Sequence, residues 1–418
     1  MKAEAHSVII VGGGVIGLAC GYYLARSGRR VTVVERDSSL LSGSSKGNAG
    51  MVVPSHFIPL AAPGVISQGL KWMLDPKSPF FLRPRLDFDL MRWLWLFYRH
   101  ANAGHVKRNA GLLRDIGLES RRLHQDLADS EGFELVQRGL LMLCQSEKGL
   151  EEEAQVAQAA QRLGLKATLF AQDRLKDFEP DCSVDALGGV WFEQDCHLNP
   201  MDFVAAMRKG ITAHGGVFFE EEAVDFVREK DQVVGVRTSK GCEHVADRIV
   251  LAGGVVSAAL ARKLDLRLPM QAGKGYSLTL KDPRKALRLC SLLKEGRVAV
   301  TPIGDTLRVA GTMEICGPDT SLSPARVQGI IESFCRFYPD FQPDDFSGIV
   351  PWIGLRPCSP DGLPYLGQLS RQDRVLIATG HSMMGLSLAP VTGMLCEKLI
   401  AGEASPIDLG ALSPERFN

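Results

Sequence analysis

The sequence predicts an α/β fold with two interleaved domains, and three observations support this prediction. Residues 7–35 read as a strand, a glycine-rich turn, a helix and a second strand, which is how a doubly wound parallel sheet begins. Strand and helix signals that fit the same sheet recur near residues 246–253 and 375–400. The segments between them contain patterns typical of antiparallel strands. The chain is therefore expected to cross between the two domains several times.

The elements of the first half follow from periodicity. Residues 7–11 form a short apolar run, residues 15–25 have helical spacing, and residues 30–35 are rich in β-branched side chains. Residues 90–98 are expected to form one helix with a Trp-rich face. Residues 150–165 predict a helix whose outer face is charged.

The second half reads mainly as strands. The segments 216–220, 223–228 and 233–238 indicate a strand meander, which precedes a strong apolar strand at 246–253. Gly304 and Asp305 predict a hairpin that joins residues 298–301 to residues 306–312. A last strand at 375–379 leads through Gly380 into a helix near residues 386–400.

Length and composition exclude several classes of protein. The 418 residues suggest two or three domains, and the 45% hydrophobic and 23% charged fractions are those of a globular protein. The 48 basic residues balance the 48 acidic ones, which argues against nucleic acid as the main partner. No apolar run is long enough to predict a transmembrane helix. The ten cysteines form no Cys-x-x-Cys pair, so we expect reduced thiols, no metal and a cytoplasmic protein.

Residues 12–17, Gly-Gly-Gly-Val-Ile-Gly, match the pattern G-x-G-x-x-G between the first strand and the first helix. Gly12 permits a tight turn, Gly14 lets backbone amides approach a pyrophosphate, and Gly17 lets the helix pack on the strand. Glu35 ends the second strand, where its carboxylate can accept ribose hydroxyls and would repel a 2′-phosphate. The pattern predicts a dinucleotide site and disfavours NADP.

FAD is the dinucleotide that the rest of the sequence favours. No second motif of this kind is present, because Leu251-Ala252-Gly253-Gly254 lacks the spacing, and there is no redox cysteine pair. Disulfide reductases and NADPH-dependent monooxygenases normally show one of these features. The single site must then hold the redox cofactor itself.

Several further motifs resemble those of the bacterial FAD-dependent D-amino acid dehydrogenases. These motifs are residues 44–50, 61–64, 274–279, 352–357, 359–364 and 380–381. They occur in one order from the first strand to nearly the C-terminus, and they also resemble the wider superfamily of D-amino acid oxidases, glycine oxidases and sarcosine oxidases. The stretch after His381 departs from the D-alanine-type dehydrogenases, and its Ala-Pro-x-Thr-Gly ending is closer to glycine oxidases. The preferred side chain of the substrate therefore stays open.

The resemblance implies how the chain is divided. A Rossmann-like FAD-binding domain would comprise residues 1–55, 196–262 and 353–418. It would be interleaved with an α+β substrate-binding domain, residues 56–195 and 263–352, built on a mostly antiparallel sheet.

The resemblance also implies a set of cofactor contacts, in which the first helix faces the ADP half and residues 380–385 lead into a helix that faces the flavin. The residues expected to bind FAD are Gly12, Gly14, Val15, Ile16, Gly17, Glu35, Arg36, Ser44, Ser45, Asn48, Ala49, Gly50, Val224, Ala252, Gly253, Gly354, Gly380, His381, Met384, Gly385, Leu386 and Ser387. Binding is expected to be non-covalent, because Cys358 lies a few residues beyond the position at which some sarcosine oxidases attach flavin.

Three residues are candidates for contact with the substrate. Arg356 lies between Gly354 and Pro357, and its guanidinium suits a carboxylate in two-point contact, as in relatives with the same Leu-Arg-Pro arrangement. Tyr276 either hydrogen-bonds the substrate or packs within a sheet. His56 follows the flavin-lining segment and either reaches the substrate or has a structural role.

The implied activity is the oxidative deamination of D-amino acids. Arg356 would fix the carboxylate so that the substrate Cα–H faces flavin N5, hydride would be transferred, and the imine would be hydrolysed to a 2-oxo acid and ammonia. The alternative is a dehydrogenase or oxidase of secondary amino acids, namely D-proline, hydroxy-D-proline, sarcosine or glycine. A flavoprotein subunit of a larger complex is a further alternative.

The electrons are expected to pass to a quinone or another electron-transfer partner. In segment 89–108 several aromatic residues stand beside basic residues. The pair Lys71 and Trp72 lies upstream of this segment. Aromatic side chains mixed with cations suit a membrane interface. Because the dehydrogenases that the chain resembles are linked to quinones and the inner membrane, the resemblance implies a cytoplasmic protein with a peripheral contact at the inner face of the bacterial inner membrane. The alternative is an ordinary core helix.

Overall fold

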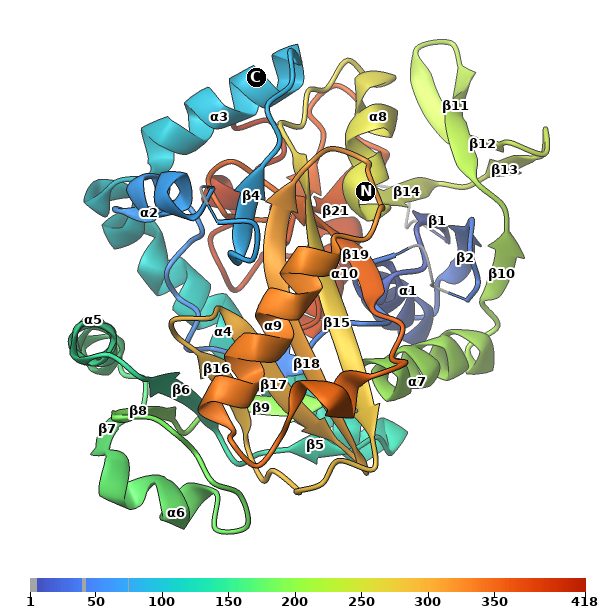
Figure 1. The fold of residues 1–418 in the computed structure, drawn as a ribbon. Coiled ribbons are helices and arrows are strands. Elements are labelled where there is room, and N and C mark those ends of the chain that lie inside the picture. Colours follow the sequence, from blue (N-terminus) through green and yellow to red (C-terminus); the bar gives the residue numbers. More distant parts are fainter. Residues whose placement is uncertain (1–5, 40–42, 74) are drawn as a thin grey trace.

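A computed structural model describes residues 6–39, 43–73 and 75–418 (Figure 1). Its first sheet has six strands in the order β10-β2-β1-β14-β21-β20, parallel throughout except for β20. The strands are β1 (Ser7–Val11), β2 (Arg30–Glu35), β10 (Val217–Glu220), β14 (Arg248–Leu251), β20 (Tyr365–Gln368) and β21 (Val375–Thr379). The central parallel strands β1, β14 and β21 are apolar and almost wholly buried, which is typical of strands covered on both faces, whereas the edge strand β10 is largely exposed.

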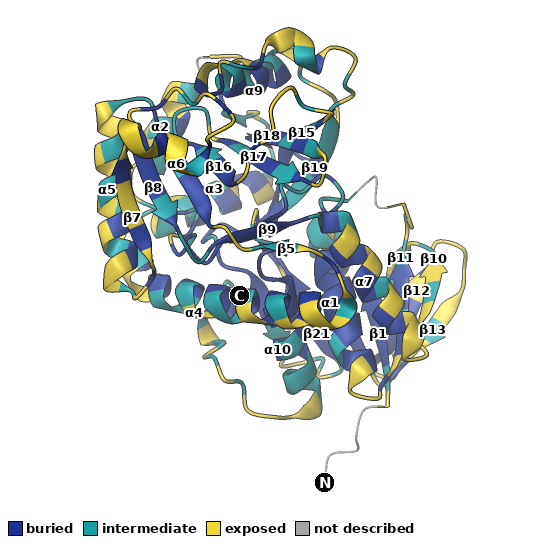
Figure 2. Ribbon diagram, turned by 90° about the horizontal axis from the view of Figure 1, so that it is seen from below, coloured by how far each residue is buried: buried dark blue, intermediate teal, exposed yellow. Residues whose placement is uncertain are grey.

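Helices cover one face of this sheet. They are α1 (Val15–Arg26), α7 (Pro200–Ala213) and α10 (Ala389–Ala401), and α4 (Ala103–Glu131) packs on α10. The other face packs on α8 (Ser257–Arg262) and on a three-stranded sheet, β11 (Ala223–Glu229), β12 (Gln232–Thr238) and β13 (Glu243–Val245). Figure 2 shows β1 buried, the edge around β10 and β13 largely exposed, and the outer faces of α4, α5 and α7 exposed. This arrangement leaves the carboxyl ends of the parallel strands free to border a ligand.

The second large sheet has nine strands. The order is β19-β15-β18-β17-β16-β6-β8-β7, with β4 beside β18. The strands are β4 (Phe80–Leu82), β6 (Leu140–Cys144), β7 (Ala167–Ala171), β8 (Gly188–Phe192), β15 (Gln271–Lys281), β16 (Cys290–Leu293), β17 (Val298–Ile303), β18 (Thr306–Ile315) and β19 (Trp352–Cys358). Most neighbours are antiparallel, and the pairs β6–β16 and β4–β18 are parallel. Helix α9 (Pro324–Phe337) lies across one face (Figure 1).

Shorter elements complete the fold. The helices are α2 (Val65–Trp72), α3 (Phe88–His100), α5 (Glu147–Arg162) and α6 (Leu175–Phe178). A small sheet joins β3 (Met51–Val52), β9 (Cys196–Leu198) and β5 (Leu135–Val136), and 3₁₀ turns lie at Gln172–Arg174, Gly254–Val256, Pro343–Phe346 and Gly410–Leu412.

The fold class predicted from the sequence is confirmed: an α/β nucleotide-binding sheet accompanies a second, mostly antiparallel sheet. The hairpin at Gly304 and Asp305 is present, and the predicted helices are found within a few residues of their expected bounds. The predicted meander is wrong in one strand. Residues 217–220 pair with β2 in the parallel sheet rather than with β11, the Glu221 N–H still bonds the Glu35 carbonyl oxygen at 3.0 Å, and pairing with β12 begins at Ala223.

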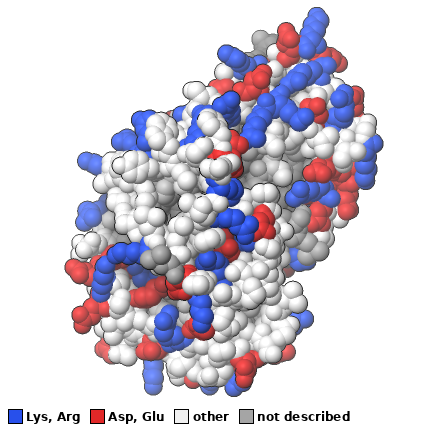
Figure 3. All heavy atoms as spheres, turned by 45° about the horizontal axis from the view of Figure 1, so that its top comes forward, with Lys and Arg blue, Asp and Glu red and all other residues white. Residues whose placement is uncertain are grey.

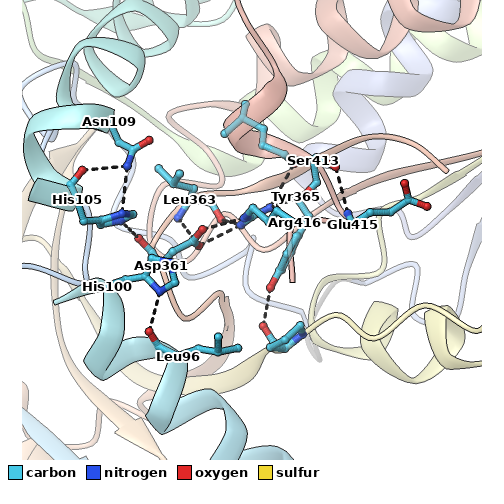
Figure 4. A network of polar contacts seen from close by, with 12 residues as sticks. Leu96, His100, His105, Asn109, Asp361, Leu363, Tyr365, Ser413, Glu415 and Arg416 are labelled. Carbon is cyan, nitrogen blue, oxygen red and sulfur yellow. Dashed lines mark hydrogen bonds and ion pairs between the residues drawn. The ribbon is translucent and has the colours of Figure 1, made fainter. Parts of the chain in front are cut away.

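A buried ion pair ties the C-terminus to the loop after β19. Asp361 is almost fully buried, and its two carboxylate oxygens accept hydrogen bonds from Arg416 at 2.8 and 3.0 Å (Figure 4). The carbonyl oxygen of Asp361 is 2.8 Å from Nε2 of His105 in α4. The motif at 359–364 therefore fixes the strand that bears Arg356 relative to both α4 and the C-terminal segment.

Candidate active site

A cavity of about 1580 Å³ lies between the two large sheets. It is bordered by the carboxyl ends of β1, β2, β14 and β21 and by strands β15, β18 and β19. A pocket for a drug-sized ligand measures roughly 300–1,000 Å³. The cavity therefore has room for a dinucleotide together with a small substrate.

The glycine-rich turn forms one end of the cavity. Gly12 has φ +105°, and a Cβ atom there would lie 2.6 Å from the carbonyl oxygen of Ala252. A Cβ atom on Gly17 would lie 1.9 Å from the carbonyl oxygen of Gly12, so this glycine allows α1 to approach β1. These are the close approaches that a dinucleotide-binding turn requires.

The N-terminus of α1 presents its amides to the cavity. The Val15 N–H donates to Oγ of Ser45 at 3.1 Å, and Gly14 faces the same hydroxyl. Backbone amides and the helix dipole make such an end suited to phosphate. The Glu35 carboxylate accepts hydrogen bonds from the N–H of Gly13 at 2.6 Å and of Asp37 at 2.9 Å, which fixes it at the rim where a ribose would lie.

Most residues expected to bind FAD line this single cavity. They are Gly12, Gly14, Val15, Ile16, Glu35, Arg36, Ser44, Ser45, Asn48, Ala49, Val224, Ala252, Gly253, Gly354, His381, Met384, Gly385 and Leu386.

Four others lie behind the cavity wall. Gly17 supports the turn, and Gly50 and Gly380 have positive φ angles beside Leu198 and the Tyr365 ring. The Ser387 hydroxyl accepts a hydrogen bond from the Val53 N–H at 3.0 Å. The structure thus gives these four residues roles in shaping the backbone around the cavity.

Three buried polar atoms on the cavity wall fit a flavin. Trp352 Nε1, His381 Nδ1 and Ser382 Oγ have no hydrogen-bond partner among the described residues, and all three residues line the cavity. The Trp352 ring lies over Gly354, where a Cβ atom would be 2.1 Å from it. Unsatisfied buried polar groups are costly in a protein interior, so a polar ligand is expected to reach them. The donor set and the glycine cradle both suit FAD.

Arg356 presents a guanidinium to the same cavity. Its Nη1 donates to the carbonyl oxygen of Thr312 at 2.7 Å, and the group lies over Gly275, where a Cβ atom would be 2.1 Å from Nη1. Arg356 forms no ion pair with any side chain in the part of the chain that the structure describes. Burial lowers its pKa, yet the guanidinium stays charged at neutral pH. A partly buried cation without an ion-pair partner among the described residues has the chemistry to bind a carboxylate.

His56 also lines the cavity, in a neutral state. Burial and the nearby charge of Arg297 lower its pKa to about 4. Its Nδ1 is 3.3 Å from Oγ of Ser55, and Ser55 donates to the buried Asp195, whose pKa burial raises to about 7. Asp195 gave no signal in the sequence, because only the fold brings it beside residues 55 and 56.

Tyr276 is among the residues that line the cavity, but its hydroxyl forms hydrogen bonds within the protein. Successive residues of β15 point to opposite faces, and Arg356 lies over the face of Gly275. The Tyr276 hydroxyl is on the other face, where it donates to Glu314 and accepts from the Ser323 N–H at 3.1 Å. Arg356 and Tyr276 are therefore neighbours in the sheet with side chains on opposite sides.

Other residues of the site were not singled out by sequence reasoning. Arg308 donates to the carbonyl oxygen of Asn48 at 2.7 Å and so holds the segment predicted to line the flavin. Trp352 and Thr312 border the cavity next to Arg356. Cys358, which the sequence analysis compared with the flavin attachment position of some sarcosine oxidases, is fully buried beside Met313 and is not among the residues that line the cavity.

Comparison with known proteins agrees with this site. The D-amino acid dehydrogenase of Granulibacter bethesdensis is 30% identical over 422 residues, which cover 98% of this chain and 99% of that protein. The D-amino acid dehydrogenase of Cereibacter sphaeroides (strain ATCC 17029) is 32% identical over 419 residues, 98% of this chain and 95% of that protein. The resemblance found from the motifs is thereby confirmed.

Solved structures share the fold. Glycine oxidase from Geobacillus kaustophilus matches with a TM-score of 0.79 and 24% identity over 99% of this chain and all of that one. L-proline dehydrogenase from P. horikoshii matches with a TM-score of 0.72 and 17% identity, over 99% and 98% of the two chains. The DAO family, described as FAD dependent oxidoreductase, matches residues 7–399. Because this match spans nearly the whole chain, the protein belongs to the DAO family of FAD-dependent oxidoreductases.

Proposed function

We propose that this protein is a dehydrogenase that oxidatively deaminates D-amino acids to 2-oxo acids and ammonia. The observation that most strongly supports the proposal is the partly buried Arg356 guanidinium, which faces a cavity with the features of an FAD site. The two relatives named above are D-amino acid dehydrogenases and match along their whole length. The proposed electron acceptor is a quinone or another acceptor that is not a pyridine nucleotide.

In this proposal Arg356 binds and orients the substrate. Its Nη1 is held by Thr312, so the rest of the planar group is free to grip a carboxylate at two points. With the carboxylate fixed, the Cα–H of the substrate takes one orientation in the cavity. The nearby histidines stay neutral at pH 7, because burial lowers the pKa of His56 to about 4 and that of His381 to about 3.

The cofactor would be bound without a covalent link, by the residues that line the cavity. The α1 N-terminus and Ser45 would hold the pyrophosphate, Glu35 the ribose, and Trp352 and His381 the flavin. When bound, FAD supplies the redox chemistry by taking up the two electrons that the substrate loses. We propose the division into an FAD-binding and a substrate-binding domain on the same basis, with β19 assigned as a whole to the nine-stranded sheet.

A substrate panel tests this function and its alternative. Under anaerobic conditions, primary D-amino acids are expected to bleach the flavin, whereas their L-enantiomers are not. Faster bleaching by D-proline, hydroxy-D-proline, sarcosine or glycine would replace the proposal with the secondary-amine alternative. No bleaching until small partner proteins are added would identify a subunit of a larger complex.

The variant Arg356→Lys tests the role of the guanidinium. An ammonium is a point charge and cannot grip a carboxylate at two points. Loss of a charged hydrogen bond costs about 1.5–3 kcal/mol, so kcat/KM is expected to fall roughly 10- to 100-fold. The flavin absorbance of the purified variant serves as the control for cofactor binding. Turnover equal to the wild type in the FAD-loaded variant would contradict the assignment.

The proposed membrane contact is formed by the exposed apolar and aromatic side chains on one face of α3. Phe88, Met91, Trp95 and Tyr98 are 54–71% exposed and lie on one face of the helix, because they are spaced by three, four and three residues. Arg99 stacks on the Trp95 ring. Figure 3 shows basic and acidic side chains interspersed, with broad uncharged areas between them. Helix α3 also borders the cavity, which supports a route to a quinone.

One part of the sequence-based interpretation of this segment is wrong. Trp93 is 4% exposed, and its Nε1 donates to the carbonyl oxygen of Cys358 at 2.9 Å, so it belongs to the interior. In the described part of the chain no helix is both long and apolar enough to cross a membrane. The contact that we propose is a peripheral one, through the exposed face of α3.

The double variant Trp95→Ala, Tyr98→Ala is expected to weaken binding to anionic vesicles and to slow quinone reduction. Reduction of a soluble dye should fall less than quinone reduction, and binding of the wild type should weaken as the salt concentration rises. Val245→Ala with Val350→Ala removes exposed apolar side chains elsewhere and serves as the control. Absence of vesicle binding together with rapid peroxide formation would instead indicate an oxidase.

A further inference from the structure

Strand β18 contains an irregularity directly beside Arg356. Lys274 of β15 pairs with Glu314, and Tyr276 pairs with Gly311. Two residues of β18, Thr312 and Met313, therefore oppose the single residue Gly275, which is a β-bulge. Thr312 has φ +72°, a conformation that residues with a side chain rarely adopt.

The bulge determines where the Arg356 guanidinium lies. The carbonyl oxygen of Thr312 accepts the 2.7 Å hydrogen bond from Nη1, and the guanidinium rests on Gly275, the residue opposite the bulge. A regular strand would turn the Thr312 carbonyl in a different direction. The position of the proposed carboxylate anchor thus depends on a strained backbone.

A buried polar cluster, here called the bulge clamp, lies on the opposite face of the sheet. It consists of Tyr276, Glu314, Lys274 and Arg326. The Tyr276 hydroxyl donates to Glu314, whose carboxylate is 3.8 Å from Lys274 Nζ and 3.5 Å from Arg326 Nε. All four side chains are at most 7% exposed. Lys274 and Tyr276 lie in β15, Glu314 lies in β18, and Arg326 lies in the N-terminal part of α9, so the cluster connects the two strands at the bulge to this helix.

A cluster of this kind is well placed to hold strain. A non-glycine residue keeps a positive φ angle only when contacts with the surrounding structure hold its backbone in that conformation. Tyr276 and Lys274 stand on either side of Gly275, and Glu314 directly follows the two bulged residues. Glu314 contacts both Tyr276 and Lys274, and these contacts hold β18 to β15 on either side of the bulge. Hydrophobic packing alone would leave the register of β18 less tightly specified.

We propose that Tyr276 and Glu314 are positioning residues, which hold the bulge and through it the orientation of Arg356 toward the substrate. This inference rests on the proposed function, because it takes Arg356 as the anchor of the substrate carboxylate. It gives the Tyr276 hydroxyl a role in the reaction that acts through the bulge, because this hydroxyl is bonded to Glu314 and to the Ser323 N–H.

The first test compares Tyr276→Phe with Tyr338→Phe. Both tyrosines are buried in the same hydrophobic cluster, but the Tyr338 hydroxyl bonds Ser291 and does not touch the bulge clamp. The readout is the second-order rate of anaerobic flavin reduction by D-alanine, which also measures very slow variants. Because small misplacements of a positioned group cost large factors in rate, Tyr276→Phe is expected to lose about 10-fold and Tyr338→Phe less than about 2-fold.

The second test is a double-mutant cycle with Arg356→Ala. If the bulge clamp acts through Arg356, adding Tyr276→Phe to Arg356→Ala should change the rate by less than about 2-fold, because the group that it positions is gone. A loss of about 10-fold in both backgrounds would overturn the inference. Equal losses for Tyr276→Phe and Tyr338→Phe would also overturn it, since they would show a general effect of losing a buried hydroxyl.

Failure of this inference can be told apart from failure of the proposed function. Arg356→Ala alone tests the anchor, and a rate equal to the wild type would contradict the proposed function. A large loss in Arg356→Ala with no loss in Tyr276→Phe would leave the function standing and refute the positioning role. Glu314→Gln gives an independent check, because it keeps the shape of the side chain while removing its charge, and it should behave as Tyr276→Phe does.

Discussion

The hydrogen bond from Arg356 to the carbonyl oxygen of Thr312 is the interaction on which the site depends. It places a charged guanidinium inside a cavity, where burial makes the charge costly until an anion joins it. Gly275 is part of the same arrangement, because any side chain there would occupy the space of the guanidinium. The carboxylate-binding chemistry therefore comes from one side chain and from the backbone that holds it.

Each of the two large sheets contributes different residues to the site. The parallel sheet supplies a glycine turn, a helix N-terminus and Glu35 at the carboxyl ends of its strands, which suit the diphosphate and ribose of a dinucleotide. The nine-stranded sheet supplies Trp352 and Arg356 from β19. The buried pair of Asp361 and Arg416 holds the segment that follows β19 against the C-terminal segment, and the Asp361 carbonyl oxygen contacts His105 of α4.

Structural features that depend on a few neighbouring residues could be predicted from the sequence. Features that depend on how distant strands pair could not. The glycine motif, Glu35 and Arg356 stand in short motifs whose geometry follows from a few neighbours. Helix α4 was not assigned, because its buried face includes His105, Asn109 and other polar residues that hide the apolar period. The bulge at Thr312 requires the pairing of β15 with β18, which no local pattern specifies. The role of Tyr276 stayed open for the same reason, since its partner Glu314 lies 38 residues away.

The central claim is that Arg356 recognises the carboxylate of the substrate, and one comparison tests it most directly. Anaerobic flavin reduction is measured with D-alanine and with D-alaninamide, which has the same Cα–H and amine but no carboxylate. The account predicts that the wild type prefers the acid by roughly 100-fold or more and that Arg356→Ala loses this preference, because the discrimination comes from a charged, buried contact. Equal rates for the acid and the amide in the wild type would contradict it.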